Sequence, residues 1–201
     1  MSRVRVKVCG VTRPEDARAA EAAGADAVGV IFAPSSRRYV THEDAARVTA
    51  ALGPFVRRIG VFAGATEAEI LEAVDAAGLD AVQLHGDVSD ATCARLRAHV
   101  NVIRAVRFAP HETPDAWADR PVDAVLLDGP SPGSGVAFDW TAAAAWRGAP
   151  RLILAGGLHP GNVAEAVAAM APYAVDVASG VEAAPGAKDP AKLAAFVAAV
   201  R

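Results

Sequence analysis

The stretch VRVKVCGVTRPEDA, from Val4 to Ala17, contains the unit from which the fold can be predicted. Its first half alternates valine with other residues, the pattern of a strand, and ends at Cys9 and Gly10. Thr12, Pro14 and two acidic residues follow at once, and these residue types are typical of a helix start. The stretch therefore predicts a strand, a short loop and a helix, with a thiol where the strand ends.

The same strand and helix pattern repeats along the whole chain. Runs rich in Val, Ile and Leu occupy residues 4–10, 26–32, 57–62, 80–86, 101–108, 122–129, 151–157 and 173–180. Alanine-rich helical segments follow them at 14–23, 42–52, 66–77, 88–98, 112–118, 141–146, 161–170 and 190–200, with Thr41, Thr66 and Ser89 as candidate N-caps. Alternation alone permits a doubly wound open sheet as well. Eight uninterrupted units favour a TIM barrel, a single-domain (β/α)8 fold over residues 1–201 with a closed parallel sheet.

Composition excludes several classes of protein. The 201 residues are 53% apolar with a net charge of −3, and no basic tract suggests a nucleic-acid partner. The N-terminus lacks the apolar segment of a signal peptide, and no run is long enough to span a membrane. Two cysteines without a pairing pattern agree with a reducing compartment. We therefore expect a cytoplasmic protein that holds any anionic ligand with local groups.

Strand alternation predicts which side chains face the barrel interior. If Val4, Val6 and Val8 face the helices, the inward residues are Arg5, Lys7 and Cys9, and the same rule selects Gln83, His85, Arg104, Leu126, Asp128 and Asp176. Because strands 8 and 1 adjoin in a closed barrel, Lys7 and Asp176 should form an ion pair that modestly lowers the pKa of Cys9.

Three of these inward side chains stand at strand ends, where the catalytic face of a barrel lies. They are Cys9, His85 and Asp128. Each also has a structural interpretation, since a cysteine can pack as a small buried hydrophobe and an aspartate before Gly129 and Pro130 suits a turn. For His85 the structural alternative is that a polar residue at the mouth shapes the site without contacting substrate.

Glycine-containing loops after the last two strands predict a phosphate site. Gly156 and Gly157 follow the seventh strand, and Ser179 and Gly180 follow the eighth. Barrels commonly bind phosphate with the backbone of these two loops, although glycine after a strand is also ordinary turn punctuation. The loop after the sixth strand holds Gly133, Ser134 and Gly135 and is either a connector or a lid.

Taken together, these segments resemble the phosphoribosylanthranilate isomerase family of tryptophan biosynthesis. The resemblance spans essentially the whole chain and rests on KVCGVTRPEDA, GADAVGVIFAPSSRRYV, VQLHGD, LAGGLHPGNV and VDVASGVEAAPGAKD in this order. One departure is the compact loop GPSPGSGVA, which has Val136 where the family often has a lysine. The resemblance therefore leaves open whether this loop closes over the site or contacts the phosphate.

The resemblance implies an Amadori rearrangement of a phosphorylated small molecule, without cofactor or metal. It makes Cys9 the general base, Asp128 the general acid and Arg38 the partner of the anthranilate carboxylate, whereas Arg37 should be solvated. His85, Gly156, Gly157, Ser179 and Gly180 are then expected to bind substrate. We expect a monomer or a homodimer without a nucleic-acid or membrane partner.

Three other functions are compatible with a barrel of this kind. The first is the related barrel isomerase of histidine biosynthesis, a family that has aspartates at both of these strand ends. Cys9 in place of one aspartate, together with Arg38, argues against it. A non-catalytic phosphate-binding barrel would not need both Cys9 and Asp128. A Schiff-base aldolase would need a lysine at the mouth, whereas Lys7 lies one inward step below Cys9.

Overall fold

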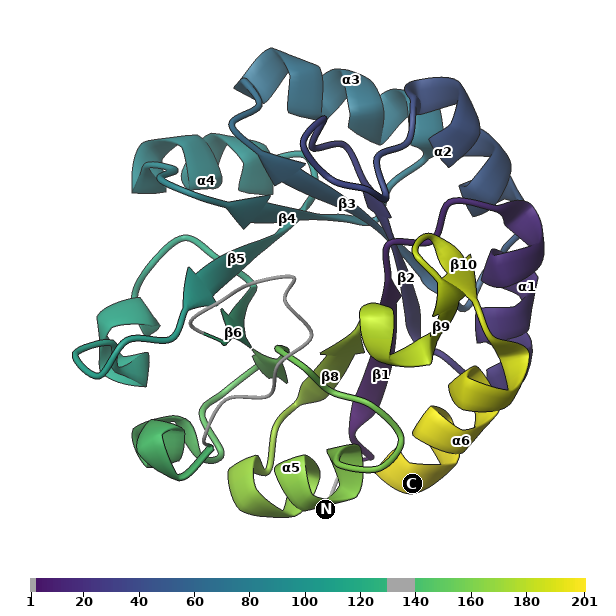
Figure 1. The fold of residues 1–201 in the computed structure, drawn as a ribbon. Helices are drawn as coiled ribbons and strands as arrows, with labels where there is room; N and C mark the ends of the chain where they lie inside the picture. The colour runs from purple at the N-terminus through teal and green to yellow at the C-terminus, as the bar shows by residue number, and fades with distance from the viewer. Residues whose placement is uncertain (1–2, 130–139) are drawn as a thin grey trace.

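A closed parallel barrel forms the centre of the protein, as a computed structural model that describes residues 3–129 and 140–201 shows. The strands follow one another around the barrel in chain order, and the last pairs with the first (Figure 1). They are β1 (Arg5–Cys9), β2 (Ala27–Ile31), β3 (Arg57–Ala63), β4 (Ala81–His85), β5 (Asn101–Arg107), β6 (Ala124–Asp128), β7 (Leu152–Leu154) and β8 (Ala174–Val177). The predicted (β/α)8 fold is confirmed, and the open sheet is excluded.

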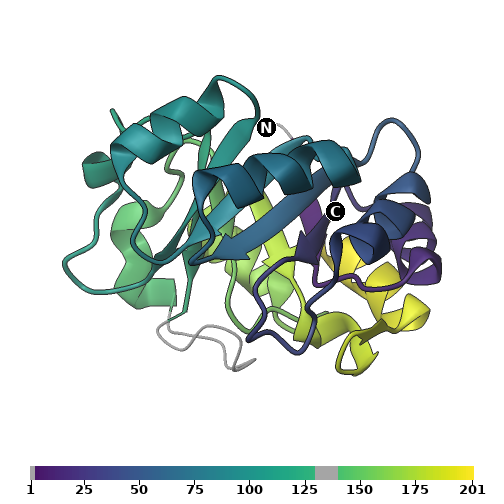
Figure 2. The same ribbon diagram turned by 90° about the horizontal axis from the view of Figure 1, so that it is seen from above.

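Helices surround the barrel and cover the outward faces of its strands, as the side view also shows (Figure 2). The α-helices are α1 (Pro14–Ala23), α2 (His42–Ala50), α3 (Glu67–Ala77), α4 (Asp90–Arg97), α5 (Val163–Met170) and α6 (Pro190–Val200). The N-caps of α2, α3 and α4 are Thr41, Thr66 and Ser89, and each side chain accepts a hydrogen bond from a backbone N–H group of its helix. The cap of α3 is a full capping box with Glu69, so these local signals predicted the helix starts correctly.

The fifth and sixth units contain 3-10 helices in place of the expected α-helices. These are η1 (Pro114–Trp117) and η2 (Trp140–Trp146), which is interrupted at Ala143. Their segments are short, and Pro121 and Pro150 follow closely, so neither can extend into several α-helical turns. Three further short elements were not predicted, namely η3 (Ser179–Val181), β9 (Glu182–Ala184) and β10 (Ala187–Lys188).

The barrel interior is packed in layers that alternate strands contribute. The even-numbered strands supply four alanines at the N-terminal end, which are Ala27, Ala81, Ala124 and Ala174. Above them the odd-numbered strands supply Ile59, Ile103 and Ile153, and Lys7 occupies the corresponding place on β1. A lysine in an otherwise apolar layer needs a buried partner.

Arg104 is a correction to the predicted interior. Ile103 and Ala105 face the interior of β5, so Arg104 faces the surrounding helices. Its guanidinium donates to the carbonyl oxygens of Leu84 and Gly86 at 2.8 and 2.9 Å and lies over the ring of Trp117. The prediction assumed that residues facing the helices are apolar, and it failed because these strand-end carbonyls satisfy a charged group on that face.

In the described ranges, no helix is long and apolar enough to cross a membrane.

Candidate active site

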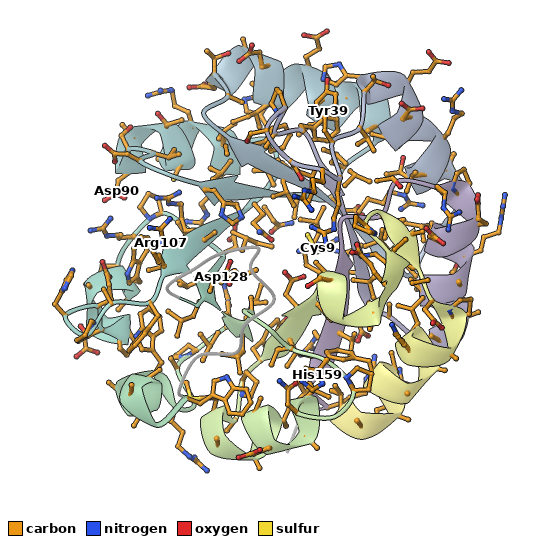
Figure 3. All side chains as sticks on the ribbon, in the orientation of Figure 1. Cys9, Tyr39, Asp90, Arg107, Asp128 and His159 are labelled. Carbon is orange, nitrogen blue, oxygen red and sulfur yellow. The ribbon has the colours of Figure 1, made fainter. Side chains whose placement is uncertain are left out.

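The carboxyl ends of the strands bring the predicted acid and base to one mouth. Cys9 ends β1, His85 ends β4 and Asp128 ends β6. Viewed along the barrel axis, Cys9 and Asp128 lie within the ring of strands, whereas Asp90 and Tyr39 lie toward the periphery (Figure 3). The structure therefore places Cys9 and Asp128 where two groups can reach one ligand from different strands.

Directly below Cys9 lies the predicted ion pair. Lys7 Nζ is 2.8 Å from Asp176 Oδ1, and both side chains are almost completely buried. Lys7 also interacts with the thiol of Cys9 and favours its ionised form. Burial nevertheless dominates and raises the pKa of Cys9 above its ordinary value, with Asp176 adding to the effect. The expectation of a modestly lowered thiol pKa is therefore wrong, because desolvation outweighs the nearby ammonium.

Asp128 has the properties of a carboxyl group that can carry a proton near neutral pH. Burial in the mouth raises its pKa to about 6, although the Gly129 N–H donates to its Oδ1 at 2.8 Å and partly offsets the effect. Asp176 raises the pKa further, whereas Lys7 and Arg107 lower it. A carboxyl group with such a pKa suits general acid catalysis.

His85 lies on the side of the mouth formed by β4. Its Nε2 is 2.8 Å from Nε2 of Gln83, which stands one inward step below it. Burial and the charge of Lys7 lower the pKa of His85 to about 4, so the imidazole is neutral near neutral pH. With Arg107 and Asp128 it lines a cavity of about 440 Å³. His85 can therefore offer a hydrogen bond to a ligand but no positive charge.

The predicted anion loops lie beside Asp128. Gly156, Gly157 and Ser179 line a cavity of about 80 Å³ together with Asp128 and Asp176. Gly156 has a φ of 87°, and a Cβ atom there would lie 2.7 Å from the backbone nitrogen of Gly129. In the described part of the chain, the N–H groups of Gly157 and Ser179 donate to no acceptor. These two donors are available to an anion.

Gly180 does not line this small cavity. A Cβ atom at Gly180 would overlap with the carbonyl oxygen of Leu158, so glycine lets the loop after β8 lie directly on the loop after β7. Its observed contribution is the close contact between these two loops.

Arg38 is held by two acceptors that the sequence did not single out. Its Nε and Nη2 donate to the two carboxylate oxygens of Glu182 at 2.6 and 2.7 Å, and Glu182 in turn accepts from buried Lys188 at 3.0 Å. Arg37 is exposed, as expected. Glu182 and Lys188 stand in β9 and β10, and the only available signal was their place in the SGVEAAPGAKD segment. The predictions made for Gly133, Ser134, Gly135 and Val136 concern residues outside the described ranges.

Fold and mouth together define a class, the (β/α)8-barrel enzymes that work with acid and base groups at the carboxyl ends of their strands. Residues 6–199 match the profile of the N-(5'-phosphoribosyl)anthranilate isomerase family. The chain belongs to this family. It is 48% identical over 198 residues to an N-(5'-phosphoribosyl)anthranilate isomerase of Citrifermentans bemidjiense. The aligned residues cover 96% of this chain and 95% of the relative.

Solved structures agree with this assignment. The phosphoribosyl anthranilate isomerase of Thermus thermophilus is 45% identical, superposes with a TM-score of 0.91, and covers 98% of each chain. A second isomerase structure, 40% identical with a TM-score of 0.87 and 98% coverage of each chain, was solved in complex with reduced 1-(o-carboxyphenylamino)-1-deoxyribulose 5-phosphate. The family resemblance that the motifs predicted is confirmed.

Proposed function

We propose that this protein converts N-(5'-phosphoribosyl)anthranilate to 1-(2-carboxyphenylamino)-1-deoxyribulose 5-phosphate in tryptophan biosynthesis, with Cys9 as general base and Asp128 as general acid. The reaction is an aldose–ketose isomerisation, in which one proton leaves C2 of the sugar and no net oxidation occurs. The observation that carries the assignment of roles is the placement of a thiol and a carboxyl of pKa about 6 at one mouth.

Asp128 acts in the first step. Its proton passes to the furanose ring oxygen while the nitrogen lone pair of the substrate forms a double bond to C1, so the C1–O bond breaks and a protonated Schiff base remains. A carboxyl whose pKa is raised to about 6 retains a protonated fraction near neutral pH. After the transfer, the new carboxylate is stabilised by the Gly129 N–H.

Cys9 acts in the second step. Its thiolate removes the proton from C2, and the electron pair of the C–H bond moves into the C1–C2 bond as the Schiff-base nitrogen becomes neutral. The resulting enol then becomes the ketone by proton transfer to C1. Lys7, which interacts with the thiol from below, stabilises the thiolate that this step requires.

The two ends of the substrate meet different groups. The N–H groups of Gly157 and Ser179 lie beside Asp128 and favour the phosphate there. Arg38 suits the carboxylate of the anthranilate ring, because a guanidinium can form two parallel hydrogen bonds with a carboxylate. Neutral His85 hydrogen-bonds the substrate from the opposite side of the mouth.

A turnover assay tests the proposal. Purified protein mixed with phosphoribosylanthranilate should consume the fluorescent substrate and form the aminodeoxyribulose product, and a chelator should not reduce the rate. The phosphoribosyl substrate of the histidine-pathway isomerase should be converted far more slowly, because it cannot supply a benzoate to Arg38. Binding of the product analogue without turnover would support the non-catalytic alternative.

Of the two assemblies expected from the sequence, a monomer or a homodimer, we propose a homodimer formed through the N-terminal end of the barrel. Phe55, between α2 and β3, is 95% exposed beside a cavity of about 640 Å³ whose floor includes the alanine layer. Because ring and cavity occupy the same face, a two-fold axis could place each Phe55 in the cavity of the other copy.

A cytoplasmic location fits a biosynthetic enzyme and stays a prediction.

A further inference from the structure

The hairpin formed by β9 and β10 lies beside β1 and β2 (Figure 1). The Thr12 hydroxyl, in the loop after β1, donates to the Gly186 carbonyl at the hairpin turn at 2.8 Å. The hairpin buries two charged side chains, Glu182 and Lys188, which are 6% and 0% exposed. Buried charges are costly unless they are paired, so their arrangement needs a physical explanation.

Lys188 fixes Glu182 in place. Its ammonium donates to the carbonyl oxygens of Cys9 and Ala178 at 2.7 and 3.0 Å and to Oε1 of Glu182 at 3.0 Å. Three donors and three acceptors leave this ammonium without unused capacity. Two of the acceptors belong to Cys9, which ends β1, and to Ala178, which directly follows β8, so Glu182 is tied to the strand ends that carry the site.

Glu182 in turn holds one edge of Arg38. The contacts from Nε and Nη2 form the side-on bidentate arrangement of an arginine and a carboxylate. Burial raises the pKa of Glu182, but Arg38 and Lys188 outweigh burial and keep the pKa below its usual value. The carboxylate is therefore ionised. The stem of Arg38 rests on Gly10, where a Cβ atom would overlap with Cδ of Arg38.

Within residues 3–129 and 140–201, no acceptor contacts the end-on edge of Arg38. This edge consists of Nη1 and the second proton of Nη2, and Nη1 donates to no acceptor in the described ranges. Because the Arg38 stem lies against Gly10, the residue that follows Cys9, the guanidinium stands next to the mouth. Among the described residues, Arg38 and Lys188 both donate to the single carboxylate of Glu182. A second carboxylate at the end-on edge would complete the cluster.

We propose that Glu182, anchored by Lys188, is a positioning residue that holds Arg38 side-on and thereby presents its end-on edge to the carboxylate of the substrate. The inference rests on the proposed function and extends it. It makes the ion pair part of the receptor, so that Arg38 need not leave Glu182 when substrate binds. The cluster then selects N-aryl sugar phosphates that carry a carboxylate on the ring over those that lack it.

The test compares two product analogues on the wild type and on Glu182→Gln. One is reduced 1-(2-carboxyphenylamino)-1-deoxyribulose 5-phosphate, and the other is the same compound without the ring carboxylate. Glu182→Gln should lower the affinity for the analogue with the carboxylate about tenfold, the size expected for one misplaced charged hydrogen bond. The affinity for the other analogue should stay within about twofold. The KM for substrate should rise correspondingly while kcat stays within about threefold.

Two further variants define the interpretation. Glu182→Asp keeps the charge, but its side chain is too short to reach both nitrogens of Arg38. It should therefore show the same selective loss of affinity for the carboxylate analogue. It also serves as the test variant if Glu182→Gln does not fold. Glu15→Gln makes the same chemical change on the exposed side of α1 and should leave both affinities unchanged.

Three results would overturn the inference. An equal loss of affinity for both analogues in Glu182→Gln would mean that Glu182 only maintains the hairpin. Tighter binding of the carboxylate analogue to Glu182→Gln would mean that Glu182 competes with the substrate for Arg38. Wild-type protein that turns over substrate yet binds both analogues equally would remove the carboxylate receptor and leave the isomerase assignment intact, whereas the absence of turnover would reject that assignment.

Discussion

Lys7 and Asp176 form an ion pair 2.8 Å long inside the barrel, one layer below the thiol of Cys9. The two charges act on that thiol in opposite directions, since the ammonium favours the thiolate and the carboxylate opposes it. Lys7→Met should therefore raise the pKa of Cys9 further, and Asp176→Asn should lower it. The pH dependence of alkylation by iodoacetamide measures both shifts, with Cys93→Ser as the common background so that one thiol reacts. Identical alkylation profiles in all variants would mean that the pair does not influence the thiol.

Cys9→Ala and Asp128→Asn should each lower kcat by about a hundredfold or more, because general acid and base groups typically contribute 10²–10⁴-fold. Affinity for the reduced product analogue should stay within about tenfold, since neither side chain is assigned to the phosphate or the ring carboxylate. Single-turnover kinetics and analogue titration separate the two effects.

Cys93→Ala is the matched control for the thiol, because Cys93 is also buried but belongs to α4 on the outside of the barrel. It should keep near-normal kcat. If Cys9→Ala retained normal turnover as well, the thiol would have only a packing role.

The pH profile of kcat/KM should have a broad plateau. The reactive form needs Asp128 protonated and Cys9 ionised, yet the pKa of Asp128 is about 6 and that of Cys9 lies above its ordinary value. The fraction of this form rises with pH up to about 6, stays constant while the loss of one proton offsets the other, and falls above the thiol pKa. Steady-state kinetics from about pH 5 to about pH 10 would reveal the plateau. A steady tenfold loss per pH unit above 6 would show that only the acid titrates and that Cys9 is not the base.

The fold was predictable because its signals are local and repeat. Each strand run and cap such as Thr66 specifies its own unit, and closure of the barrel then makes β1 and β8 neighbours, so the pairing of Lys7 with Asp176 followed from topology. Arg104 was misplaced because its satisfying groups are backbone carbonyls, which leave no trace in the side-chain pattern. The cluster of Glu182 with Arg38 joins residues 144 positions apart through a hairpin too short to have a periodicity.

The same limit applies to the pKa of Cys9. The sequence identified the two charges near the thiol but could not give the depth of its burial, which decides the sign of the shift. Cys9 is 6% exposed, and at that depth desolvation exceeds the effect of one ammonium. The positions of titrating groups were therefore predictable, whereas their energetic balance required the packed structure.

Inorganic phosphate should inhibit the enzyme competitively, and Gly180→Ala should weaken this inhibition about tenfold or more. The added methyl group would meet the Leu158 carbonyl and force apart the two loops that present Gly157 and Ser179. Gly161→Ala is the control in the same loop region, because its Cβ would meet only the ring of His159 at 3.2 Å. Phosphate bound instead near Arg57 and Arg58, at the N-terminal start of β3, would place the anion site at the wrong end of the barrel.

Phe55→Asp should convert a homodimer into a monomer while leaving kcat within about twofold. In the proposed pairing the ring enters the partner's alanine-lined cavity, and removing a buried phenylalanine side chain costs about 1.5–3 kcal/mol at each of two equivalent contacts. A carboxylate there would additionally lose its hydration. Light scattering across a concentration series measures the mass, and a second variant, Ala81→Arg, fills the receiving cavity without altering the ring. The active mouth lies at the opposite end of the barrel, so activity reports independently on folding. Wild-type protein that remains a monomer at high concentration, or a dimer that survives both substitutions, would exclude this face as the interface.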